Sequence, residues 1–191
     1  MRTYLQVLSP FIGLSAVLFG LGVVLGLAML RVAPEMAAAI MADVEEFIGT
    51  ARGLSRLEIF LFIVTNNVFK TLVMMMLGVI LGIAPVFFLV SNGAVLAIVA
   101  AGAGAAEGAA VVIAGLVPHG IIELAAVFMG AAAGLHLGTV MVQRILARPV
   151  LFMPWVKSAW RLFVRVLLPM LILAGAIETW ITPAVAELAR G

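Results

Sequence analysis

Long stretches without a charged residue dominate the chain, and short polar segments separate them. A helix needs about 20 apolar residues to cross the hydrocarbon core of a bilayer, so each long stretch predicts one spanning helix. The expected fold class is all-α, a polytopic membrane helix bundle that forms a single membrane domain over residues 1–191. The pattern places the five spans at about residues 8–30, 59–90, 93–117, 120–142 and 162–181.

Two of the separators are short enough to predict tight hairpins between antiparallel helices. Ser91, Asn92 and Gly93 suit a turn, because asparagine and glycine tolerate positive φ. Pro118 suits the first turn of the fourth span, where an amide has no helical acceptor in any case. Gly120, two residues later, would let a neighbouring backbone come close.

The segment between the first two spans follows a different period. Apolar residues recur at helical spacing from Met36 to Leu54, and Asp43, Glu46 and Arg52 fall on other faces. This spacing predicts an extramembrane amphipathic helix over about residues 35–55. Its polar face is acidic, which favours docking onto the bundle or onto a partner protein over binding to anionic lipid.

Composition places the chain among integral membrane proteins. Hydrophobic residues make up 65% and charged residues 10% of the sequence, far from the soluble balance of roughly half apolar and about a quarter charged. The formal net charge of +2 gives no basic footprint for nucleic acid. Residues 3–30 carry no charge, so this stretch is too long for a cleavable signal core and indicates a retained signal anchor. The absence of cysteine excludes disulfides and thiolate sites.

Charge asymmetry predicts the orientation in the cell membrane. The segment before the last span and its edges hold five basic residues and no acid, which marks the cytoplasmic face. These residues are Arg144, Arg148, Lys157, Arg161 and Arg165. Five crossings then place the N-terminus in the cytoplasm, and the acidic first loop and the C-terminus outside. Trp155 and Trp160 would lie at the inner interface and Trp180 near the outer one.

Glycine pairs four residues apart predict close helix contacts, because bare backbone ridges can approach each other in lipid. The alternatives are contacts within one chain and contacts between subunits of a homo-oligomer. The pairs are Gly22–Gly26, Gly78–Gly82, Gly104–Gly108, Gly130–Gly134 and Gly134–Gly138.

Several polar residues fall inside the predicted spans, where an ionisable side chain costs about 2.5–3.5 kcal/mol on insertion scales. We expect one buried polar cluster in the outer leaflet, with Glu123 either paired with Lys70 or protonated. In the alternative, Lys70 and Glu178 extend separately to the outer interface. For His136 we expect a hydrogen bond to a helix carbonyl. The cluster would contain Asn66, Asn67, Lys70, Glu107, His119, Glu123 and Glu178.

No constellation in the sequence indicates catalysis. His119 and Glu123 lie four residues apart but lack a third metal ligand of matching spacing, and no nucleophile elbow or phosphate loop is present. We therefore expect no enzymatic activity, no metal and no cofactor.

Several short motifs resemble the stage II sporulation protein M family of multi-spanning membrane proteins. The likeness covers roughly residues 57–144 and rests on "NN" at 66–67, "LGVILG" at 77–82, "SNG" at 91–93, "PHGIIEL" at 118–124 and "GAAAGLHLG" at 130–138. In spore formers, members of this family work beside two peptidoglycan-degrading proteins. The resemblance implies a noncatalytic membrane scaffold that recruits protein partners on the outer face, surrounded by membrane lipids. The alternative function is a small transporter, channel or lipid-handling protein that uses the polar cluster.

Overall fold

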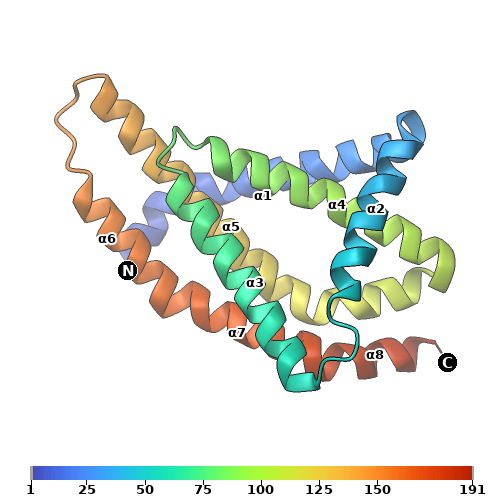
Figure 1. The fold of residues 1–191 in the computed structure, drawn as a ribbon. Coiled ribbons are helices and arrows are strands. Elements are labelled where there is room, and N and C mark those ends of the chain that lie inside the picture. Colours follow the sequence, from blue (N-terminus) through green and yellow to red (C-terminus); the bar gives the residue numbers. More distant parts are fainter. Residues whose placement is uncertain (1, 191) are drawn as a thin grey trace.

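A computed structural model describes residues 2–190, which form helices and short connections with no strand among them (Figure 1). Five helical segments are long and apolar enough to cross a membrane, which confirms the all-α polytopic prediction. Four of them are single helices, and the fifth is a continuous rod built of the last five elements. The elements are α1 (Arg2–Val32), α2 (Pro34–Gly49), α3 (Arg56–Leu77), α4 (Ile83–Glu107), α5 (Ala109–Ile145), α6 (Met153–Leu162), η1 (Phe163–Leu167), α7 (Leu168–Ala176), η2 (Ile177–Ile181) and α8 (Thr182–Ala189).

Successive spans run in opposite directions. The start of α1, the α3–α4 turn and the α5–α6 loop lie at one end of the bundle, on the left in Figure 1. The α4–α5 turn and the end of α8 lie at the other end. Helix α5 is central, because it contacts α1, α3, α4, α7 and α8. Its small-residue stretch from Gly130 to Gly138 is buried throughout, whereas the outer helices leave many large apolar side chains exposed, as lipid contact requires.

The limits predicted for the second and third spans are wrong. Helix α3 begins where Ser55 and Glu58 form a capping box, but it ends at Leu77, and α4 begins at Ile83. The chain reverses between them through Leu81 and Gly82, whose φ angles are 54° and 76°. Because this turn contains only apolar residues and glycine, its sequence looks like the interior of a span.

The predicted hairpin at Ser91–Gly93 is also wrong, since these residues lie inside α4. The Asn92 side chain donates a hydrogen bond of 2.7 Å to the carbonyl of Phe88, one turn earlier, so the helix itself satisfies part of the amide. The second reversal occurs instead at Gly108, where φ is 91°. The residues before Gly108 therefore end a spanning helix.

Pro118 and Gly120 lie inside α5, which begins at Ala109, so the prediction that Pro118 starts a helix is wrong. A Cβ added at Gly120 would meet nothing within 4 Å, which contradicts the predicted close approach there. The span predicted at 120–142 extends in the structure over Ala109–Ile145.

Two stretches of the last rod, η1 and η2, are wound with the wider π turn. Each lies just before a proline, Pro169 or Pro183. Proline has no amide for the usual bond to the fourth preceding carbonyl, and a wider turn accommodates that loss without ending the helix. The wide turn at η2 includes Glu178.

Helix α2 confirms the predicted amphipathic helix but ends at Gly49 rather than near residue 55. It docks onto the bundle through its apolar face, at the middle and at the end of the helix. The Met41 methyl group packs over Gly102 of α4, and the Phe47 and Phe62 rings lie 5.1 Å apart between α2 and α3. Helix α2 thus bridges α4 and α3 on the side opposite to their connecting turn (Figure 1).

The predicted glycine contacts form within the chain at most positions. An added Cβ at Gly22 or Gly26 would overlap the backbone of α4, and one at Gly93 would overlap the backbone of α1. Gly104–Gly108 is the exception, because a Cβ at either position would meet nothing within 4 Å. The same kind of overlap connects the α3–α4 turn with α5, through Gly78, Gly82, Gly134 and Gly138, and Gly130 lies against Thr71 of α3.

Candidate functional site: a polar cavity inside the bundle

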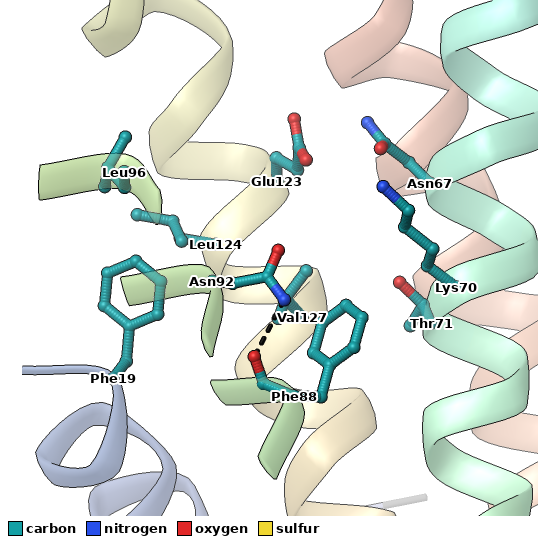
Figure 2. Close-up of a pocket in the computed structure, with 10 residues that line it drawn as sticks. All are labelled: Phe19, Asn67, Lys70, Thr71, Phe88, Asn92, Leu96, Glu123, Leu124 and Val127. Carbon is teal, nitrogen blue, oxygen red and sulfur yellow. Dashed lines mark hydrogen bonds between the residues drawn. The ribbon is translucent and has the colours of Figure 1, made fainter. Parts of the chain in front are cut away.

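A cavity of about 160 Å³ lies among α1, α3, α4 and α5. Its wall combines aromatic and aliphatic side chains with five polar ones, of which Lys70 and Asn92 are exposed, so the cavity reaches the surface of the bundle. Figure 2 shows Glu123 of α5 projecting into the space that Asn67 and Lys70 of α3 enter from the other side. The lining residues are Phe19, Asn67, Lys70, Thr71, Phe88, Asn92, Leu96, Glu123, Leu124 and Val127.

Lys70 and Glu123 share the cavity but do not form the ion pair that was one of the two alternatives expected for Glu123, since their charged atoms do not come within 4.0 Å of each other. The Lys70 ammonium instead lies 5.4 Å from the centre of the Phe47 ring, which α2 supplies. An aromatic face attracts a cation through its quadrupole. Lys70 therefore contacts α2 rather than the carboxylate across the cavity.

The two predicted asparagines face different surroundings. Asn67 lines the cavity, whereas Asn66 lines a separate apolar groove with Phe62 and Phe69. The Asn66 amide donates a hydrogen bond of 3.1 Å to the Asn67 side-chain oxygen. Asn66 thus orients the Asn67 side chain from outside the cavity.

A second group of polar side chains adjoins the first at Glu123. His119, Glu123 and Glu178 each place one potential ligand atom within 4.8 Å of the other two. His119 and Glu123 share a face of α5, and the wide turn η2 supplies Glu178. His119 Nδ1 also lies 3.2 Å from the Thr182 hydroxyl. A cavity of about 280 Å³ borders this group at His119, Gly120 and Glu123.

The family comparison agrees with the motifs. A model of the family described as stage II sporulation protein M matches residues 15–183, most of the chain. The chain belongs to the stage II sporulation protein M family. Together with the five apolar helices, this membership identifies a multi-pass membrane protein. No curated protein and no solved structure matches the chain.

Glu107 lies outside the polar cluster, so the prediction that it belongs to the cluster is wrong. It ends α4 at the bundle surface and forms an ion pair with Arg190, just beyond α8. The Arg190 guanidinium donates hydrogen bonds to the Glu107 carboxylate, and these bonds raise the pKa of Arg190. Both side chains are about half exposed, at 46% and 58%, so solvent screens the pair and it contributes little to stability.

His136 has aromatic surroundings rather than a carbonyl partner. Its ring packs edge-on against Tyr4, Phe11 and Trp155, with centroids 6.1, 5.6 and 4.6 Å away. Its Nδ1 is buried and has no hydrogen-bond partner among the described residues. The predicted hydrogen bond to a helix carbonyl is therefore wrong for this nitrogen.

Sequence reasoning missed three polar residues that the family fold brings to the site. Thr71 and Asn92 line the first cavity, and Thr182 contacts His119. Thr71 directly follows Lys70 along α3, so its position in the sequence already indicated a polar group at the same depth. Nothing in the local sequence connects Thr182 with His119, because α8 reaches α5 only through tertiary packing.

Proposed function

We propose that this chain is a noncatalytic membrane scaffold that recruits a protein partner through the acidic face of α2. The observation that carries the proposal is the exposure of that face. Helix α2 contains four acidic residues and no basic one, and all four acidic side chains are exposed. They form no ion pair with another described side chain. These residues are Glu35, Asp43, Glu45 and Glu46.

The arrangement of α2 favours a protein over lipid as its partner. The buried Ala37 and the packed Met41 attach the apolar face to the bundle, while Met36, Phe47 and Ile48 stay partly exposed beside it. The remaining acidic face would be repelled by anionic headgroups. A partner with a basic surface complements this charge, and such complementarity speeds association and selects the partner.

Recruitment of an external partner also depends on the orientation in the membrane. The five basic residues from Arg144 to Arg165 flank the α5–α6 loop and begin the last rod. Positive residues in a short loop favour the cytoplasmic side, which would place α2 outside.

Neutralising the acidic face tests this proposal. We expect Asp43→Asn, Glu45→Gln and Glu46→Gln together to lower the yield of a cross-linked partner from native membranes several-fold, because the complementary charges are lost. The yield from the unaltered chain should also fall as salt is raised.

The matched control is Glu107→Gln with Glu187→Gln, which removes acidic charge from elsewhere on the same end of the bundle. Thermal unfolding in detergent shows whether each variant is folded. Recovery of self-contacts alone, or equal partner yields from the acidic-face variant and the control, would contradict recruitment through α2.

A second candidate, a small transporter, channel or lipid-handling protein, is supported by the cavity and its polar lining. Ion or solute flux through liposomes, compared for the native chain and Glu123→Gln, separates the two functions. A scaffold should leak no more than empty vesicles. Flux through the native chain that falls in Glu123→Gln would favour the second candidate.

A further inference from the structure

We propose that His119, Glu123 and Glu178 bind a divalent transition-metal cation of the Zn²⁺ or Mn²⁺ type. The sequence supplied only the first two residues as a metal pair and no third ligand. The fold supplies the third, because η2 brings Glu178 beside the His119–Glu123 face of α5. This site is separate from the recruitment surface, since α2 contributes none of its three ligands.

The distances suit a cation after a small side-chain movement. One potential ligand atom from each residue lies within 4.8 Å of the other two. Tetrahedral bonds of about 2.0–2.1 Å place ligand atoms roughly 3.3 Å apart. The longest separation therefore has to shorten by at most about 1.5 Å, which rotation of flexible glutamate side chains can supply without moving either helix.

Charge gives an independent reason for a cation at this point. Glu123 and Glu178 are partly buried within spanning helices, and neither forms an ion pair with a described side chain. Two neighbouring carboxylates in a poor solvent repel each other and lose hydration. A divalent cation between them neutralises both charges, whereas Lys70 forms an ion pair with neither.

The surroundings of the imidazole resemble those of a metal ligand. His119 Nδ1 lies 3.2 Å from the Thr182 hydroxyl, and Thr182 is 9% exposed. A hydrogen bond to one ring nitrogen orients the imidazole of a ligating histidine. The adjoining cavity of about 280 Å³ also leaves space for water to complete the coordination.

The ligand types select the class of cation. Imidazole favours zinc and its neighbours in the first transition row, while carboxylates also accept manganese. Calcium and magnesium prefer oxygen ligands alone, and magnesium keeps most of its water. We therefore expect Zn²⁺ and Mn²⁺ to bind more tightly than Ca²⁺ or Mg²⁺.

Zinc titration of the purified full chain tests the site. The protein carries an affinity tag without histidine, is stripped with a chelator, and is titrated in detergent by calorimetry. We expect one Zn²⁺ per chain, and at least about tenfold weaker binding in His119→Gln and in Glu178→Gln. His136→Gln and Glu107→Gln are the matched controls, since they remove the only other histidine and an acid outside the site, and they should bind as the native chain does.

X-ray absorption on the zinc-loaded native chain tests the site without a variant that could misfold. It should show one imidazole and otherwise oxygen ligands at about 2.0–2.2 Å. A native chain that takes up no stoichiometric Zn²⁺, a spectrum with no imidazole or two, or unchanged affinity in both ligand variants would overturn the proposal. Calcium binding as tight as zinc binding would overturn the assigned class. Loss of partner capture would not bear on any of these measurements.

Discussion

Several polar side chains inside the spans bond to their own helix. The hydroxyl groups of Ser15 and Thr179 each donate a hydrogen bond of 2.8 Å to the carbonyl four residues earlier, and Asn92 uses its amide in the same way. The buried exceptions are the Tyr4 hydroxyl and His136 Nδ1, which have no partner among the described residues. A buried polar atom without a partner lowers stability, so His136 is held by its aromatic contacts rather than by hydrogen bonding.

Substitution of His136 separates these two contributions. We expect His136→Phe to keep or raise the midpoint of unfolding in detergent, because it removes the unpartnered nitrogen and keeps edge-on aromatic contacts. His136→Ala should lower the free energy of unfolding by roughly 3 kcal/mol, since it leaves a cavity between Tyr4 and Trp155. Equal losses in both variants would show that the imidazole nitrogens themselves stabilise the bundle.

Among the helices, closely packed glycines set the approach of α1 to α4. A Cβ at Gly26 would overlap the carbonyl oxygen of Ala94 and come within 2.8 Å of its Cα. Backbone atoms cannot rotate away as a side chain can, so the two helices would have to separate. At Gly20, in the same helix, a Cβ would meet nothing within 4 Å.

These two glycines should respond to alanine with opposite signs. Gly26→Ala should lower the free energy of unfolding by about 1–3 kcal/mol through overpacking. Gly20→Ala should leave it unchanged or raise it by up to about 1 kcal/mol, because alanine favours the helix. Unfolding of both variants in the same detergent checks the difference. A loss at Gly20 as large as that at Gly26 would mean that helix packing does not distinguish the two positions.

The sequence was informative about elements and much less so about their ends. Charge-free length predicted five spans, and glycine spacing predicted close helix contacts, whose partners, α1 with α4 and the α3–α4 turn with α5, only the structure shows. The turns were misplaced because the one at Gly78–Gly82 is wholly apolar, whereas Asn92, which resembles a turn residue, bonds inside a helix. Glu178 was predicted to share a polar cluster with His119 and Glu123, and the structure brings these three together, but their approach to within 4.8 Å depends on tertiary packing of η2 against α5.

At the scale of the whole molecule, alternating spans place Ser55 and Ser158 at opposite ends of the bundle. Ser55 caps the start of α3, and Ser158 lies in α6, where the last rod begins. We expect Ser158→Cys to be labelled by a reagent from the cytoplasmic side and Ser55→Cys from the outside, because the basic residues surround Ser158. The native chain has no cysteine and therefore serves as the unlabelled control. Labelling of both positions from one side would contradict the alternation, and reversed labelling would contradict the orientation.

Helix α2 connects an exposed surface of the bundle directly with a residue that lines the cavity. Its acidic face is exposed, while on its other face Phe47 lies against Lys70, which lines the cavity, and Met41 rests on α4. At the opposite end, α3 and α4 are held together by their turn against α5. A force that pulled α2 away from the bundle would therefore act far from that turn. It would break the contact between Phe47 and Lys70 before it disturbed the glycine packing against α5.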